Sequence, residues 1–255
     1  MNFIVANNKG GTGKTITTTN LAALLHAQGR NFKVIELDSV NKSFILPNSD
    51  FLTPERAVSI TINKADAAIN DMLFDLMSDD SLDFIIDVGG GPDTASVLDL
   101  ILPLDLQKTY IIPLLKIKMY IENALTTYEQ INDPQNTVFL LNQYTNLENI
   151  KSEFKYFFGD KYMGIEPVSP IFKTAKTIYM PFSELFQIAS DDSQTILDLA
   201  SVSRGVSELE ARKMAFELSK GDRAKFAALR TQYNNSLDAQ KIFDEMIVST
   251  RALFE

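Results

Sequence analysis

The chain has 255 residues, of which 45% are hydrophobic and 22% charged, values typical of a globular protein with a large core. It contains no cysteine, which excludes disulfides, thiolate metal sites, iron–sulfur clusters and thiol nucleophiles. The formal charge of −9 argues against wholesale coating of nucleic acid, although a sum says nothing about a local patch. No apolar run approaches the roughly 20 residues that span a bilayer, and no basic leader precedes the first apolar run, so we expect a cytoplasmic protein.

Short apolar runs alternate with amphipathic stretches over the first two thirds of the chain. Runs typical of buried strands occupy residues 2–6, 32–37, 83–87, 110–113 and 137–142, and a sixth short strand is expected near 165–172. Helical spacing predicts helices over residues 14–28, 54–79, 93–102, 117–131 and 146–158. Gly29 stands where a left-handed C-cap is expected to end the first helix. This alternation predicts a doubly wound α/β fold whose mainly parallel sheet is covered on both faces.

The last third of the chain has a different pattern. From about residue 174 onward the spacing is mainly helical, and a long amphipathic stretch runs from 222 to 254 after a break at Gly221. No linker, repeat or low-complexity segment separates this region from the rest. We therefore expect one domain over residues 1–255, with the C-terminal helices packed on or beside the sheet.

A glycine-rich turn follows the first predicted strand at residues 8–15, Asn-Lys-Gly-Gly-Thr-Gly-Lys-Thr. A strand, such a turn and a helix are the context of a P-loop, because backbone N–H groups and the helix N-terminus attract phosphate oxygens. Lys14 is expected to contact the β- and γ-phosphates, and Thr15 to offer its hydroxyl to Mg²⁺. A turn that binds nothing would not explain the motif, its position and its flanking elements together. The predicted nucleotide-binding residues are Gly10, Gly11, Thr12, Gly13, Lys14, Thr15 and Ile16.

One position departs from the usual P-loop pattern G-x-x-x-x-G-K-[ST], which requires glycine where this chain has Asn8. Residues 9–15 fit the deviant pattern K-G-G-x-G-K-[ST], which resembles that of the ParA/MinD ATPases, a SIMIBI-type family of P-loop NTPases. The resemblance implies ATP hydrolysis with Mg²⁺, an ADP product state and a homodimer held together by ATP. It also implies that Lys9 acts with Lys14 in catalysis by reaching across the interface to the partner's nucleotide.

The second predicted strand ends in Glu36-Leu37-Asp38, which is similar to the family's switch segment D-x-D-P-Q. Glu36 replaces the first aspartate, and Ser39-Val40 replaces the Pro-Gln pair, so Asp38 alone carries over. An aspartate here can position the attacking water and interact with the Mg²⁺ shell. The alternative is an ordinary carboxylate at a strand end.

Residues 83–87, followed by Gly89-Gly90-Gly91, look like a Walker B strand that delivers Asp87 to the water shell of Mg²⁺. Thr15, Asp38 and Asp87 together form the predicted metal site. The glycines are read either as a switch loop that closes around the γ-phosphate or as a plain turn. Family members more often have Asp-x-Pro-Pro, so the subfamily and the hydrolysis rate stay open.

Asn142 ends the fifth predicted strand, where the family commonly places an asparagine that reads the adenine edge. A turn asparagine that caps the following helix is the alternative reading. His26, the only histidine, lies late in the first predicted helix and is given no catalytic role.

The stretch from Arg204 to Arg230 has seven basic and four acidic residues, so it carries +3 and the remainder of the chain −12. In the ParA branch C-terminal basic residues bind DNA without sequence preference, and this stretch is a candidate for that surface. A solvated helix face is the alternative. Residues 243–255 are not basic, unlike the membrane helix that ends MinD-type relatives, so we do not expect membrane attachment.

The resemblance favours a ParA-like ATPase that acts as a dimerisation switch in DNA partition, positioning or conjugative transfer, the last as in VirC1/StbB-like ATPases. Small partition ATPases usually rely on a separate adaptor, so a ParB-like or relaxosome-like partner is expected. The alternatives are a MinD-like spatial regulator of another cargo and a metabolic P-loop ligase of the dethiobiotin synthetase type. Lys9 counts against the ligase.

Overall fold

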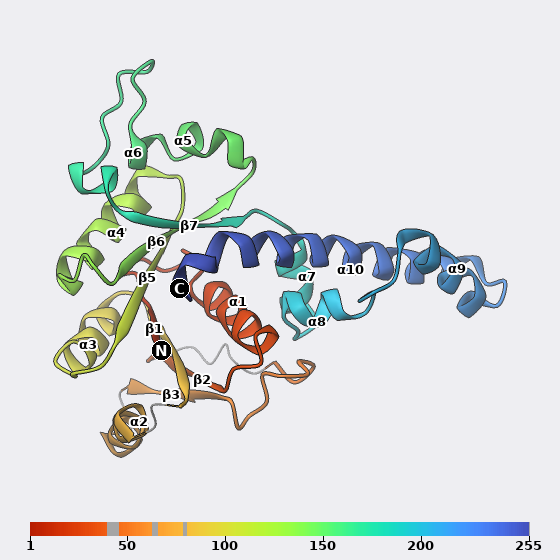
Figure 1. The fold of residues 1–255 in the computed structure, drawn as a ribbon, viewed down its shortest axis with the longest axis horizontal. Coiled ribbons are helices and arrows are strands. Elements are labelled where there is room, and N and C mark those ends of the chain that lie inside the picture. Colours follow the sequence, from red (N-terminus) through yellow and green to blue (C-terminus); the bar gives the residue numbers. More distant parts are fainter. Residues whose placement is uncertain (40–45, 63–65, 79–80, 255) are drawn as a thin grey trace.

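A computed structural model describes residues 1–39, 46–62, 66–78 and 81–254 of the chain (Figure 1). Its centre is a seven-stranded sheet in the order β3-β2-β4-β1-β5-β6-β7, and all of the strand pairs are parallel. The doubly wound α/β prediction is confirmed. The strands are β1 Asn2–Val5, β2 Phe32–Leu37, β3 Ala57–Ile60, β4 Asp83–Val88, β5 Lys108–Leu114, β6 Thr137–Tyr144 and β7 Lys176–Pro181.

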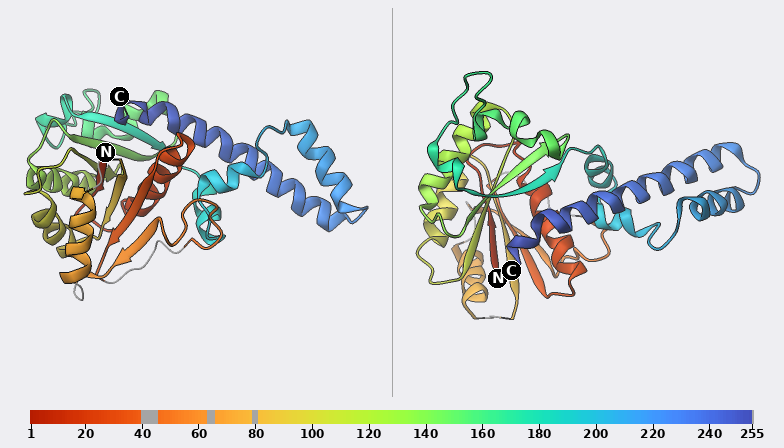
Figure 2. Two further views of the ribbon diagram at one scale, coloured as in Figure 1. Left: turned by 60° about the horizontal axis from the view of Figure 1, so that its bottom comes forward. Right: turned by 45° about the horizontal axis from the view of Figure 1, so that its top comes forward.

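Helices cover both faces of the sheet (Figures 1 and 2). Successive strand residues point to opposite faces, so Phe3 packs into one apolar core and Ile4 into the other. The first face holds α1 Lys14–Ala27, α7 Leu185–Asp191, α8 Ile196–Ser201 and the C-terminal part of α10 Arg223–Thr250. The second face holds α2 Asp66–Ser78, α3 Pro92–Ile101, α4 Lys118–Ile131, α5 Ile150–Glu153 and α6 Lys155–Phe158.

The sixth strand was predicted in the wrong place. Residues 170–173 form a 3-10 helix rather than a strand, and the strand is β7 at Lys176–Pro181. Pro167 and Pro170 lack the N–H donors that a sheet ladder needs, and the Ser169 hydroxyl caps the 3-10 helix. In β7 the β-branched and aromatic residues before Pro181 fit a strand instead.

Two predicted helices were also wrong in part. Within 54–79, residues 57–60 form the edge strand β3, paired with β2, and the helix α2 covers only 66–78. The segment 146–158 breaks into a 3-10 turn and the two short helices α5 and α6. Elements this short contain too few apolar residues to distinguish the strand period from the helix period. The sequence alone therefore did not show where a strand or a break interrupts the helical pattern. The helices predicted over 14–28, 93–102 and 117–131 are confirmed as α1, α3 and α4.

The C-terminal region is mainly helical, as predicted, and part of it leaves the body of the protein. Helix α9 Glu208–Ser219 and the first turns of α10 lie side by side and project away from the sheet (Figures 1 and 2). We call residues 207–230 the arm. Ala211 and Ala215 of the arm form a small core with Tyr233, which follows the arm on α10. No helix in the described ranges is both long and apolar enough to cross a membrane.

Strand order decides where a ligand can bind. The chain moves from β1 to one side of the sheet for β2, β3 and β4, and then to the other side for β5. The carboxyl end of β1 is therefore a topological switch point, where the loops that follow neighbouring strands diverge and leave a crevice. Residues 8–13 lie in this crevice between β1 and α1.

Candidate functional site

The turn between β1 and α1 has the backbone shape of a phosphate-binding loop. Gly11 and Gly13 have positive φ angles of 74° and 90°, a conformation that side-chain-bearing residues rarely adopt. The Nζ atom of Lys14 folds back over the turn and donates to the carbonyl oxygens of Asn7 at 3.3 Å and Lys9 at 3.4 Å. Beside it opens a cavity of about 290 Å³, whose lining includes Gly10, Gly11, Gly13, Lys14, Thr15, Ile16, Asp38 and Asp87.

Asp87 lines this cavity and is 3% exposed. Its Oδ2 atom accepts a hydrogen bond of 2.9 Å from the Thr15 hydroxyl, whereas its Oδ1 atom is buried without a hydrogen-bond partner. Burial raises the pKa of Asp87 to about 7, although the Thr15 hydroxyl and the Lys14 ammonium both oppose this rise. A buried carboxylate oxygen with no partner next to a hydroxyl fits a cation site.

Around this cavity, no group of three or more metal-ligating side chains occurs in the part of the chain that the structure describes. Mg²⁺ keeps several waters and is usually bound by one or two carboxylates plus substrate phosphates, so the contact between Thr15 and Asp87 is compatible with such a site. Thr15 and Asp87 are in direct contact, and Asp38 lines the same cavity. The structure thus brings the three predicted metal-site residues together.

Asp38 follows β2 and is half-buried at the cavity wall. Burial lowers the pKa of Lys14, while the carboxylates of Asp87 and Asp38 act in the opposite direction. Glu36, the glutamate in the switch-like segment, is buried and accepts a hydrogen bond of 2.5 Å from the Ser59 hydroxyl on β3. Of the Ser39-Val40 pair, Val40 lies outside the described residues.

The glycine turn after β4 packs directly on the phosphate-binding loop. A side chain at Gly90 would begin 3.4 Å from the backbone nitrogen of Gly10 and 3.5 Å from the Lys14 ammonium. Gly91 donates its N–H to the Asn8 carbonyl at 2.8 Å. The loops after β1 and β4 are therefore joined by a backbone hydrogen bond.

Several residues whose hydrogen bonds stabilise the site were not identified from the sequence. Asp93, in the first turn of α3, accepts a 2.8 Å hydrogen bond from the Ser39 N–H and thereby connects the segment after β2 to that after β4. Asn7 is fully buried; its amide donates to the Pro113 carbonyl and accepts from the Lys9 N–H. No motif marks such residues, because their bonds join segments that are far apart in the chain.

Asn142 lies beneath the phosphate-binding loop and is 2% exposed. Its amide donates to the Thr12 carbonyl at 2.9 Å and lies so close to Gly13 that a β-carbon there would fall 2.2 Å away. This asparagine therefore supports the loop from below and requires glycine at position 13. The amide retains a second N–H and its oxygen, so contact with adenine stays a prediction.

Two of the predicted loop residues, Lys9 and Thr12, do not line the cavity of their own chain. Lys9 is half-buried, and none of the six ion pairs among the described residues includes it. Thr12, by contrast, is fully buried and its hydroxyl turns back to the Lys9 carbonyl at 3.4 Å. The predicted residues thus divide into cavity-lining groups, buried supports and Lys9, which is half-buried and outside the cavity lining.

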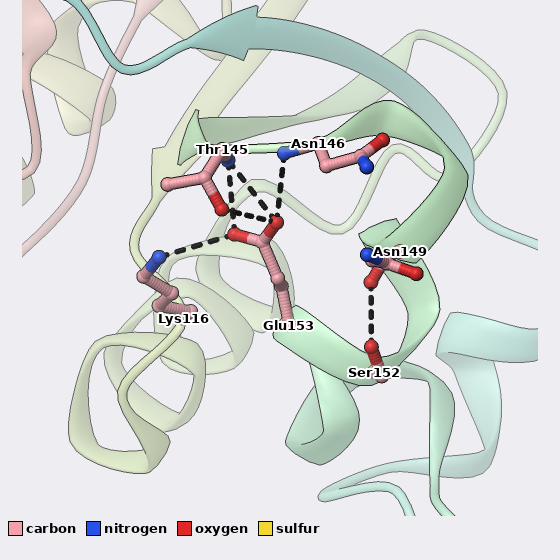
Figure 3. A network of polar contacts seen from close by, with 6 residues as sticks. All are labelled: Lys116, Thr145, Asn146, Asn149, Ser152 and Glu153. Carbon is pink, nitrogen blue, oxygen red and sulfur yellow. Dashed lines mark hydrogen bonds and ion pairs between the residues drawn. The ribbon is translucent and has the colours of Figure 1, made fainter.

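Glu153 holds in place the segment that follows β6, the strand that contains Asn142 (Figure 3). It accepts hydrogen bonds from the Thr145 hydroxyl and from the N–H groups of Thr145 and Asn146, and it pairs with Lys116 at 3.1 Å. Burial disfavours the charged form, but these donors outweigh burial and lower the pKa of Glu153 to about 2. The network holds the β6–α5 loop in one conformation.

We expect Glu153→Gln to lower the free energy of unfolding at pH 7 by about 1 to 2 kcal/mol, because each unit of pKa shift corresponds to about 1.4 kcal/mol and solvent screening of this partly exposed carboxylate reduces the total. The folded-state pKa lies below the usual value of 4.5, so this stability is present above pH 4.5 and is lost as the pH falls toward 2. Urea unfolding at pH 7, 5 and 3 measures it, with the exposed Glu148→Gln as control. A difference between wild type and Glu153→Gln that does not shrink at low pH would contradict the assignment.

The cavity, its glycine-rich loop and the switch-point position define a nucleotide-binding α/β protein of the P-loop class. The family model for the CobQ/CobB/MinD/ParA nucleotide binding domain matches residues 3–243, and the chain belongs to this family, which includes the ParA- and MinD-like ATPases. No curated protein matches the sequence.

Solved structures with a similar fold include MinD proteins and an McdA protein. The MinD cell division protein of Aquifex aeolicus is 16% identical, with 77% of this chain and 89% of that chain covered and a TM-score of 0.50. The septum site-determining protein MinD of Pyrococcus horikoshii, complexed with Mg-ADP, is 14% identical over 95% and 98% of the two chains, also with a TM-score of 0.50. A Cyanothece McdA variant bound to ATP is 14% identical over 91% and 96%, with a TM-score of 0.48. At these identities the likeness to the two MinD proteins shows the fold.

Proposed function

We propose that this protein is an ATP-dependent dimerisation switch of the ParA type, which acts in DNA partition, positioning or conjugative transfer. The observation that carries the proposal is the placement of the two loop lysines. Lys14 lines the cavity of its own chain, whereas Lys9 leaves the same loop without lining it. A second copy placed face to face across the cavity mouth gives Lys9 a phosphate to contact.

The residues of the cavity suit ATP or ADP with Mg²⁺. Gly10, Gly11 and Gly13 offer backbone N–H groups and close approach, and Lys14 and the α1 N-terminus offer positive charge. Thr15 and the partnerless Oδ1 of Asp87 would hold the cation, which neutralises phosphate charge when it is bound. The fold-level relative from Pyrococcus horikoshii is itself complexed with Mg-ADP.

Asp38 is the proposed positioning group for the attacking water, because its half-buried carboxylate lines the cavity. Its role is orientation, since a carboxylate is too weak a base to deprotonate water on its own. With Lys9 supplied by a partner, the site of one copy is incomplete. Hydrolysis in the isolated chain is therefore expected to be slow, and an adaptor of the ParB or relaxosome kind is expected to stimulate it.

Sedimentation velocity with ATP, with ADP and without nucleotide tests the switch. We expect a dimer with ATP and a monomer with ADP at the same protein concentration, in salt high enough to screen surface contacts. Hydrolysis of ATP should return the dimer to monomers within the same sample. A wild-type protein that binds ATP and stays monomeric would refute the dimerisation switch.

The arm is the proposed DNA-binding surface. Its six cations, Arg212, Lys213, Lys220, Arg223, Lys225 and Arg230, are all exposed, and none takes part in an ion pair within the described ranges. Two of its four acidic residues, Glu210 and Asp222, are already engaged as helix caps. Unpaired, exposed cations can release counterions from DNA phosphates.

We expect Lys225→Glu with Arg230→Glu to weaken nonspecific DNA binding at least tenfold and to lower the slope of log K against log salt by about 2. Fluorescence anisotropy with random-sequence duplexes measures both quantities. Lys161→Glu with Lys173→Glu, which changes two exposed lysines outside the arm, is the matched control. Absence of DNA binding by the ATP-bound wild type would contradict the DNA proposal and favour another cargo, as for a MinD-like regulator.

A further inference from the structure

A second cavity, of about 470 Å³, opens where α10 leaves the body of the protein, and the nucleotide site does not use it. Its apolar part includes Phe51 and Phe243, both buried, together with Ala27, Leu197 and the half-exposed Ile247. The ring of His26 stacks on Phe51, with centroids 4.6 Å apart and planes 9° from parallel. We call this cavity the α10 groove.

The polar rim of the α10 groove is acidic. Asp50, Asp198 and Asp244 line it, against the single cation Arg204. Asp198 is satisfied internally, because it accepts from Thr195 and from the Asp50 N–H. Asp244 accepts only from Gln240 among the described contacts, and the carboxylate of Asp50 is exposed. Two carboxylates are thus available over an apolar floor, which suits a basic segment with apolar side chains.

The chain itself carries such a segment in the arm. The arm exposes six cations, and it also exposes large apolar side chains: Phe216 is 67% exposed and Leu218 48% exposed. Exposed apolar residues of this size, next to unpaired charges, are typical of a surface that contacts another macromolecule. The arm projects from the body, so it is sterically free to meet another molecule (Figures 1 and 2).

Both surfaces lie on one helix, in opposite halves. Arg223, Lys225 and Arg230 occupy the N-terminal half of α10, and Asp244 lies in the C-terminal half. From Lys225 to Asp244 the helix rises ~29 Å at about 1.5 Å per residue. When two α10 helices lie antiparallel about a two-fold axis, the basic half of each faces the acidic half of the other. A two-fold contact needs such a self-complementary surface.

We infer that the arm of one copy docks in the α10 groove of a second copy, and that the exchange is reciprocal. The cations Lys225 and Arg230 pair with Asp50 and Asp244 of the other copy, while apolar arm residues cover the groove floor. This contact goes beyond the proposed nucleotide switch, because it involves neither Lys9 nor the phosphate-binding loop. The contact uses the same arm cations that are proposed to bind DNA. DNA and a second copy therefore cannot occupy the arm at the same time.

A charge-swap experiment on the nucleotide-free, full-length chain tests the inference. The arm variant is Lys225→Glu with Arg230→Glu, and the groove variant is Asp50→Lys with Asp244→Lys. By sedimentation equilibrium at low salt, we expect wild type to dimerise and each variant to bind itself at least about tenfold more weakly, since attraction becomes repulsion at both contacts. An equimolar mixture of the two variants should associate again, because each arm then meets a groove of opposite charge.

The controls separate this contact from other effects. Lys161→Glu with Lys173→Glu should leave the wild-type association unchanged, and circular dichroism checks that each variant is folded. Should the groove variant unfold, Asp50→Asn with Asp244→Asn removes the same charges and should also weaken dimerisation. A wild type that stays monomeric, or variants that do not associate when mixed, would overturn the inference. If the arm variant loses DNA binding while wild type shows no self-association, the arm serves DNA alone and the inference is likewise overturned. No nucleotide is present, so the result is independent of the ATP-dependent dimer.

Discussion

Lys14→Ala is expected to weaken ATP binding by at least ~100-fold, because charge-assisted hydrogen bonds to phosphate are among the strongest that a side chain makes. In the structure the ammonium group bridges the Asn7 and Lys9 carbonyls inside the loop, where it is poised over the cavity. Isothermal titration calorimetry with ATP and Mg²⁺ measures the loss. Lys173→Ala, which removes an exposed lysine outside the cavity, is the matched control.

The same substitution should not unfold the protein. Burial lowers the pKa of Lys14, which means that the folded protein holds this charge at a cost in the absence of phosphate. The thermal midpoint of Lys14→Ala without nucleotide should therefore equal or exceed that of wild type. A variant that is folded and still binds ATP with wild-type affinity would show that the cavity is not the phosphate site.

Asp38→Ala is expected to retain ATP and to slow hydrolysis by about 100-fold or more, the contribution typical of a positioned general base or water-orienting group. Because ATP then persists, the dimer should accumulate and dissociate only with nucleotide exchange. Single-turnover hydrolysis and sedimentation on the same samples measure both effects. Asp105→Ala, an exposed aspartate outside the cavity, provides the control. Hydrolysis by Asp38→Ala at the wild-type rate would remove Asp38 from the mechanism.

The parts of the fold that the sequence predicted are those encoded locally. Residues 3–6 and 84–86 are unbroken apolar runs, and such runs have few alternatives to a buried parallel strand. The edge strand β3 has only four residues and half-exposed side chains, so no alternation distinguished it from a helix. The last strand was predicted too early in the chain, because the segment around residue 171 is apolar. That segment also contains prolines, which cannot donate to a sheet ladder, and it forms a 3-10 helix instead.

The residues of the candidate site also divide into those that the sequence predicted and those that it did not. The loop from Lys9 to Thr15 is a contiguous motif, and the ends of β2 and β4 bring Asp38 and Asp87 to it because parallel strands end at one edge of the sheet. Asn142 is predicted from its place at the end of an apolar run and from the family resemblance, whereas its bond to the Thr12 carbonyl depends on tertiary packing. Asp93 and Asn7 bond across segments that no spacing rule relates.

The central claim is that Lys9 serves the nucleotide of a second copy, and one sedimentation velocity experiment tests it directly. Two proteins are compared with bound ATP and Mg²⁺. The first carries Lys225→Glu with Arg230→Glu, which removes the arm contact, and the second carries Lys9→Ala in addition. Calorimetry first confirms that Lys9→Ala binds ATP in its own cavity. The account predicts a dimer for the protein with Lys9 and an ATP-bound monomer for Lys9→Ala. An equally stable ATP-dependent dimer with and without Lys9 would contradict it.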